Sequence, residues 1–202
     1  MKKIFVLPIS IMLAFTSCCQ KNATCQTSNE QAIIDAIQTR VSVRQFTGEE
    51  VSEEQIQTLL KCAFSAPTAV NKQPWDILVI TDKEIIKQIG EKFPNSRCQN
   101  NPSVVFCLCG NMEKALEGEA REYWIQDVSA AMENLLLAAH GMGLGAVWVG
   151  IHPISERVQA HRELLGLPSN VVPLGLAVVG HPNEQPEVKN KFKEENIHYN
   201  KW

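Results

Sequence analysis

The chain has 202 residues and lacks most of the features that mark a specialised class of protein. Its net charge of −3 provides no basic field for nucleic acid. Nothing repetitive or strongly acidic suggests a solenoid or a disordered protein. With 45% hydrophobic and 20% charged residues, it has the balance of an ordinary globular domain.

The usual catalytic and metal-binding motifs are missing as well. There is no HExxH, no GxSxG and no Walker-type loop among the 202 residues. The 7 cysteines form no CxxC, and no Cys/His spacing suits zinc. Cys107 and Cys109 are two residues apart in a strand-like run, so we expect both in the core on one face of a strand. The sequence shows no obvious catalytic acid, base or nucleophile. If the protein is an enzyme, this absence indicates that a bound cofactor carries the chemistry.

The N-terminus is a separate segment. Lys2 and Lys3 precede an apolar run over residues 4–15, which is too short for a membrane-spanning helix of roughly 20 residues. This order predicts a signal peptide over residues 1–17. The small residues before Cys18 resemble a bacterial lipoprotein cleavage site and make Cys18 the candidate lipidation site. We expect an exported protein anchored to a membrane of the cell envelope. The alternatives are plain secretory cleavage, an uncleaved apolar anchor, or a cytoplasmic protein if the leader is not processed.

Beyond Cys18 the sequence predicts a polar tether over residues 18–29 and one domain over residues 30–202. Apolar residues at helical spacing predict helices, and runs rich in β-branched residues predict strands. Helices are expected over residues 30–38, 52–64, 83–92 and 155–165, with the longest starting near Met112 or Glu119 and ending at His140. Strands are expected over residues 75–80, 103–109, 146–149 and 171–179, with Pro173 at a strand start or edge. Their order indicates one α+β domain with a central sheet.

Three clusters could carry a ligand. In the first, Arg40, Ser42 and Arg44 alternate, so in an extended chain they project to one side. Two guanidinium groups and a hydroxyl suit a phosphate, because arginine offers a fork of donors to its oxygens. The alternative is a solvated basic turn.

The second cluster is the loop over residues 65–75, which contains Asn71 and Gln73. Their amides offer both donors and acceptors, which suits the edge of a heterocycle. Taken alone, a capped turn rich in proline and asparagine explains the loop better.

The third cluster is Gly141, Gly143 and Gly145, followed by Trp148, Val149 and Gly150. A dinucleotide fingerprint is rejected, because these glycines follow a helix rather than a strand. They fit a helix end and a turn, and small residues here let backbone N–H groups approach a flat ligand.

Taken in this order over residues 31–202, the clusters resemble the nitroreductase-like family of flavoproteins. The resemblance also includes Asp127, Ala131 and Asn134 in the long helix, and the ending Ile197-His-Tyr-Asn-Lys-Trp202. It implies an α+β fold, with a central mixed or antiparallel sheet flanked by helices, in an intertwined homodimer. It also implies an enzyme that binds FMN at the dimer interface.

The resemblance assigns roles residue by residue. It implies that Arg40, Ser42 and Arg44 hold the phosphate and ribityl chain. A loop from the partner subunit would line the flavin through Pro67, Thr68, Ala69, Asn71 and Gln73. The backbone of Trp148, Val149 and Gly150 would meet the ring. Lys191 stands where the family commonly has an arginine that binds phosphate.

The implied activity is electron transfer through bound FMN in two half-reactions. NADH or NADPH would be the donor, and a nitroaromatic, a quinone or a related small molecule the acceptor. No side chain is implied as a catalytic group. The alternatives are another electron donor, a dehalogenating or flavin-modifying role, or a flavin-binding lipoprotein without activity. The segment Gly110–Tyr123 is the candidate lid, whose conformation the sequence does not fix.

Overall fold

A computed structural model describes residues 20–202, the first nine of them by backbone alone. The predicted leader and Cys18 therefore lie outside the described residues. The chain divides after Asp35 into two compact units, and the second, Ala36–Trp202, holds the sheet. No helix among residues 20–202 is long and apolar enough to cross a membrane.

The first helix, α1, spans Gln20–Thr39 and so begins ten residues before the predicted start at residue 30. Its first half contains no apolar repeat, which is the signal that sequence periodicity detects. Helical backbone therefore extends into the segment predicted as a tether. The role of residues 18–29 as a tether stays a prediction.

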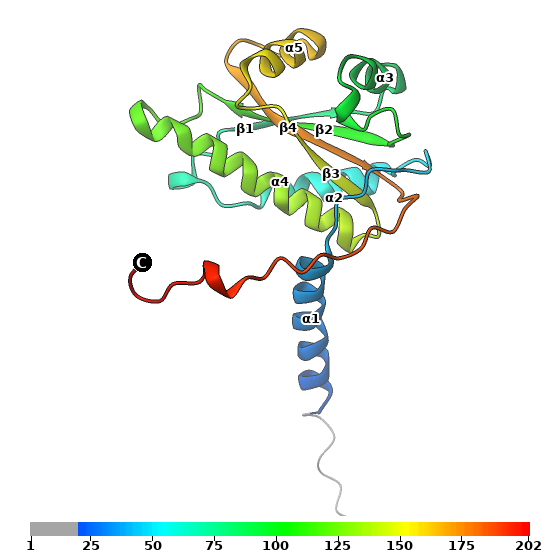
Figure 1. Ribbon diagram of the computed structural model, residues 1–202, viewed down its shortest axis with the longest axis vertical. Helices are drawn as coiled ribbons and strands as arrows, with labels where there is room; N and C mark the ends of the chain where they lie inside the picture. The colour runs from blue at the N-terminus through cyan, green and yellow to red at the C-terminus, as the bar shows by residue number, and fades with distance from the viewer. Residues whose placement is uncertain (1–19) are drawn as a thin grey trace, which may run out of the picture. The chain divides into compact units, whose positions relative to one another are not determined.

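The core is built on a four-stranded antiparallel sheet in the order β1-β2-β4-β3. The strands are β1 Trp75–Ile80, β2 Val104–Asn111, β3 Gly145–Gly150 and β4 Val171–Gly180. One face is covered by α2 Glu53–Phe64 and α4 Tyr123–Gly141, and the other by α3 Lys83–Lys92 and α5 Ser155–Leu165 (Figure 1). The predicted α+β class with a central sheet and flanking helices is confirmed.

β2 shows how the sheet divides the core. All eight of its residues are buried, because helices cover both faces. Phe106 and Leu108 pack with α2 and α4, whereas Cys107 and Cys109 join the cluster on the α3 side. The two thiols are at most 1% exposed and their sulfurs lie 3.6 Å apart. The predicted burial of this pair on one strand face is confirmed.

Local signals in the sequence set several boundaries. Ser52 and Gln55 form a capping box at the start of α2, in which each side chain bonds the other's backbone N–H. Asp82 caps α3 through its carboxylate. Gly166 ends α5 with a φ of 65°, in the left-handed region that glycine adopts readily.

The predicted start of the long helix at Met112 is wrong, and Glu119 falls in a short 3₁₀ helix, η3 Gly118–Glu122, that leads into α4. Side chains hold the preceding segment in another conformation. Asn111 donates to Asp76 at 2.7 Å, and Lys114 pairs with the same carboxylate at 2.7 Å. The candidate lid is therefore tied to β1 at its beginning.

Pro173 lies in β4, which has a neighbour on each side. Pairing with β3 begins only at Gly175, so the missing N–H of Pro173 interrupts no bond on that side. The register with β2 also shifts beside this point. The predicted position of Pro173 near a strand start is confirmed.

Candidate functional site

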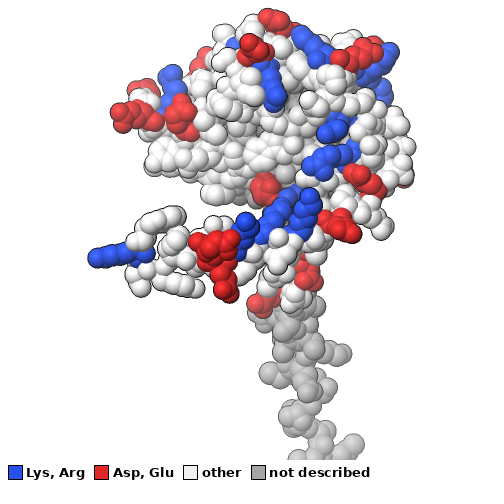
Figure 2. Space-filling model, in the orientation of Figure 1, with Lys and Arg blue, Asp and Glu red and all other residues white. Residues whose placement is uncertain are grey.

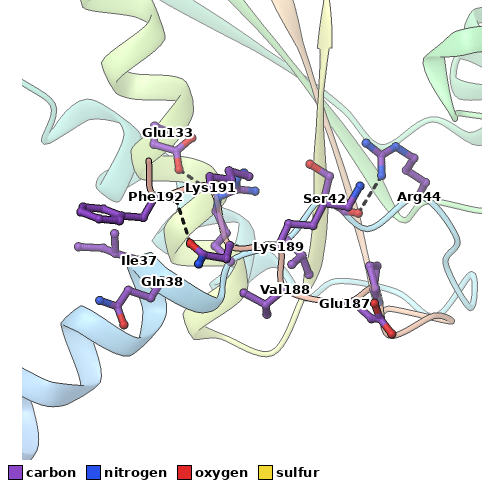
Figure 3. Close-up of a pocket in the computed structure, with 14 residues that line it drawn as sticks. Ile37, Gln38, Ser42, Arg44, Glu133, Glu187, Val188, Lys189, Lys191 and Phe192 are labelled. Carbon is purple, nitrogen blue, oxygen red and sulfur yellow. Dashed lines mark hydrogen bonds and ion pairs between the residues drawn. The ribbon is translucent and has the colours of Figure 1, made fainter. Parts of the chain in front are cut away.

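A cavity of about 750 Å³ lies beside the segment that follows α1. Three parts of the chain line it: residues 37–44, Glu133 of α4, and the segment after β4. Figure 3 shows Glu133 and Lys191 at one end, Arg44 at the other, and Ser42 between them. The structure therefore brings together four of the predicted site residues, Arg40, Ser42, Arg44 and Lys191.

The extended backbone after α1 explains this arrangement. The N–H of Val43 donates to the carbonyl of Ala146 in β3 at 3.0 Å, and the side chain of Val43 is buried. Gly145 makes room for it, since a Cβ there would lie 2.6 Å from a Val43 methyl group. Because Val43 points into the core, its neighbours Ser42 and Arg44 face outward to the cavity.

The segment after β4 reaches the cavity because it runs beside residues 44–47. The N–H of Thr47 donates to the carbonyl of His181 at 3.0 Å, and the N–H of Asn183 donates to the carbonyl of Gln45 at 2.9 Å. The N–H of Arg44 donates to the carboxylate of Glu184. These bonds bring the following residues, including Lys189 and Lys191, to the cavity.

Four basic side chains, Arg40, Arg44, Lys189 and Lys191, and two acidic ones, Glu133 and Glu187, line the cavity. The excess of cations and the hydroxyl of Ser42 form a donor set that fits a phosphate group. In Figure 2, basic atoms gather where the chain leaves β4 and runs toward the C-terminus, with acidic atoms beside them. Sequence reasoning missed Lys189, although its spacing of two from Lys191 puts both on one side of an extended chain.

Both arginines are held by oxygen atoms of the protein. The Nε of Arg40 lies 3.0 Å from a carboxylate oxygen of Glu133. The Nη1 of Arg44 donates to the carbonyl of Ser42 at 3.1 Å. Each guanidinium keeps further donors, since arginine has five N–H groups.

The loop Pro67–Gln73 contains hydrogen bonds between its own residues. The N–H of Gln73 donates to the hydroxyl of Thr68 at 3.1 Å, and the side-chain amide of Gln73 donates to that of Asn71 at 3.0 Å. Val70, Asn71 and Gln73 all have a positive φ, between 45° and 55°. Residues other than glycine rarely adopt this conformation, and it persists where surrounding structure enforces it, often at ligand sites.

Asp127 of α4 helps to hold the loop Pro67–Gln73 in this conformation. Asp127 is 6% exposed, and its carboxylate accepts the backbone N–H of Ala69 at 2.8 Å. The sequence named Asp127 as part of the family signature without giving it a role. Within one chain, the structure does not bring Pro67, Thr68, Ala69, Asn71 and Gln73 to the cavity of Arg40.

Trp148, Val149 and Gly150 end the edge strand β3 and likewise line a different surface from that cavity. Gly150 is exposed and Val149 partly so, so backbone is accessible here. Trp148 packs over Gly175 of β4, where a Cβ would lie 2.6 Å from the indole nitrogen. An open strand end with a fixed indole suits a flat ligand.

The part of the chain that the structure describes gives little support for metal-dependent catalysis or for a cysteine nucleophile. No group of His, Cys, Asp and Glu side chains there could hold a metal ion. Burial raises the pKa of Cys98 to about 11, although a hydrogen bond with Ser96 opposes the shift. The hydrogen bond with Cys109, together with burial, raises the pKa of Cys107. These thiols stay protonated at neutral pH and are poor nucleophiles.

Comparison with known proteins identifies the family to which this fold belongs. The model of the nitroreductase family matches residues 37–96 and 91–181. A protein of Archaeoglobus fulgidus with the provisional name NADH dehydrogenase/NAD(P)H nitroreductase is 38% identical over 169 residues, covering 82% of this chain and 96% of that protein. The chain belongs to the nitroreductase family.

Two solved structures extend the likeness to three dimensions. One, from Parabacteroides distasonis and with the same provisional name, has a TM-score of 0.78 and 34% identity, and covers 84% of this chain and 98% of that one. The other, the NADPH:FMN oxidoreductase of Vibrio harveyi in complex with NAD⁺, has a TM-score of 0.76 and 27% identity, and covers 85% of this chain and 78% of that one.

Proposed function

We propose that the protein is an FMN-dependent oxidoreductase that uses NADH or NADPH to reduce small organic acceptors. The observation that carries the proposal is the cavity in which Arg40, Ser42, Arg44 and Lys191 meet. Its basic donor set fits a phosphate monoester. The names of the relatives from Archaeoglobus fulgidus and Vibrio harveyi support the nicotinamide donor and the flavin.

In this proposal the chain supplies binding and orientation. Arg40, Ser42, Arg44 and Lys191 hold the phosphate of FMN, with Lys189 adding positive charge. Bound FMN supplies the two-electron chemistry between the nicotinamide donor and the acceptor. No side chain has to act as a nucleophile.

The loop Pro67–Gln73 is suited to the polar edge of the flavin. Asn71 and Gln73 bond to each other and keep further donors and acceptors for a heterocycle. The backbone at Val149 and Gly150 is accessible for a flat ring. Nitroaromatics and quinones, being flat, fit such a surface as acceptors.

The proposal includes a homodimer, because loop and phosphate cavity do not meet within one chain. A partner subunit would bring its Pro67–Gln73 loop to the flavin. The segment after β4 supports this, since it exposes Phe192 by 67%, Tyr199 by 81% and Trp202 fully. We infer that these aromatic side chains become buried against the partner subunit. Sedimentation should show a dimer, and a flavin-loaded monomer would contradict the shared site.

Export and anchoring through Cys18 remain part of the proposal, carried by the sequence of residues 1–18. A Cys18→Ala variant should lose the lipid anchor and leave the membrane fraction. An exported enzyme would not normally meet NAD(P)H, so the leader is the one observation that favours another electron donor, another flavin reaction, or flavin binding alone.

Flavin binding tests the site directly. The purified dimer should bind FMN much more tightly than riboflavin, because only FMN carries the phosphate that the basic cavity recognises. Equal affinity for both would remove the phosphate assignment.

A further inference from the structure

Glu133 is the acidic side chain closest to the arginine at one end of the phosphate cavity. It projects from α4 between buried residues such as Met132 and Leu136, which are at most 3% exposed. The backbone that carries Glu133 is therefore fixed by the core. Its own side chain is 46% exposed and free to face the cavity (Figure 3).

The contact between Glu133 and Arg40 uses one particular donor. The carboxylate oxygen lies 3.0 Å from Nε of Arg40, whose side chain is 17% exposed. Within residues 20–202, the only other hydrogen bond of Arg40 runs from its backbone N–H to Ala36. The two terminal nitrogens of the guanidinium therefore remain available to a ligand.

A guanidinium group is planar, so a contact that fixes Nε also fixes the direction of its two terminal nitrogens. An arginine without such a contact samples several rotamers and loses that freedom when it binds phosphate. A side chain that is oriented beforehand loses less on binding. The carboxylate opposes this gain with its negative charge, but Arg44, Lys189 and Lys191 keep the cavity basic.

We propose that Glu133 is a positioning residue that orients Arg40 toward the phosphate of FMN, and so sets how strongly the site prefers FMN to riboflavin. The inference rests on the proposed function. It assigns Glu133 no contact with the flavin and no part in electron transfer.

The test compares dissociation constants for FMN and riboflavin in the full-length protein and four variants. These are Glu133→Ala, Glu133→Gln, Arg40→Ala and the double variant Arg40→Ala/Glu133→Ala, with Glu163→Ala on the exposed side of α5 as the matched control. Glu133→Ala should weaken FMN about tenfold and change riboflavin less than about twofold. Glu133→Gln keeps an oxygen acceptor and should lose less. The double variant should be no weaker than Arg40→Ala, because Glu133 acts through Arg40.

Three results would overturn the inference: Glu133→Ala binding FMN as tightly as the parent or more tightly, equal weakening of both flavins, or additive losses in the double variant. A merely structural role for Glu133 would weaken both flavins alike. If the parent shows no preference for FMN over riboflavin, the proposed function fails too. If the parent prefers FMN and Glu133→Ala keeps that preference, only the role of Glu133 fails.

Discussion

Replacing Asp127 by alanine tests whether α4 holds the flavin loop in its unusual conformation. The Asp127 carboxylate is buried and accepts the N–H of Ala69 at 2.8 Å. From the next residue the chain enters the positive-φ region, which Val70, Asn71 and Gln73 adopt. Removing the acceptor leaves a partly buried N–H without its partner and frees the loop to relax.

The size of the effect follows from the type of bond. A hydrogen bond to a charged group contributes about 1.5–3 kcal/mol to stability. In a domain of this size, each kcal/mol shifts the melting temperature by about 2–4 °C. Asp127→Ala should therefore lower the melting temperature by about 3–12 °C. Asp127→Asn keeps an oxygen acceptor without the charge, so it should lose about half as much.

Thermal unfolding of the FMN-free protein measures this loss, and a titration with FMN measures the loop's contribution to binding. Gln126→Ala is the matched control, since Gln126 is the exposed neighbour on the same helix. The variant should melt lower and bind FMN more weakly, while the control matches the parent. A melting temperature and an FMN affinity equal to the parent's would refute the role of Asp127.

Three further predictions address the cavity and the core. Arg44→Ala should weaken FMN about 10- to 100-fold by direct titration, because the phosphate loses a charge-assisted bond of about 1.5–3 kcal/mol; unchanged retention would contradict the phosphate assignment. Burial lowers the pKa of His161 below its ordinary 6.5, so its contribution to stability is full above pH 6.5 and is lost as the pH falls below that value. Urea unfolding at pH 8 and pH 5 should show this loss, and His161→Phe should reduce it; an equal loss in both proteins would assign the effect elsewhere. Gly110→Ala should cost about 1–3 kcal/mol in the same assay, because its Cβ would lie 2.2 Å from the Trp124 ring, whereas Gly141→Ala meets nothing within 4 Å and should not destabilise.

Much of the fold could be predicted because its signals are local. The capping box at Ser52, the cap at Asp82 and the continuous apolar run of β2 each depend on neighbouring residues. The start of α1 cannot be predicted from periodicity, because its first turns have no apolar stripe. The start of α4 lies later than the sequence predicts, because Asn111 and Lys114 bond to Asp76, a residue far from them in sequence.

The residues of the site were also predictable only where the signal is local in the sequence. The alternation of Arg40, Ser42 and Arg44 predicted a shared side, and Val43 in the core confirms it. Glu133 could not be found from sequence, because its contact with Arg40 depends on how α4 packs. Spacing along one chain also cannot say which subunit supplies a loop. The assignment of Pro67–Gln73 to the partner subunit therefore came from the family resemblance and stays a prediction.

The most direct test of the central claim is the visible spectrum of the purified protein, recorded with FMN before and after NADH or NADPH is added without oxygen. The purified protein should be yellow, bleach with the nicotinamide donor and recover its colour when a nitroaromatic or a quinone is added. A protein that binds FMN but does not bleach would keep the site and contradict the nicotinamide-dependent activity. A protein that cannot be loaded with FMN would contradict both the site and the function.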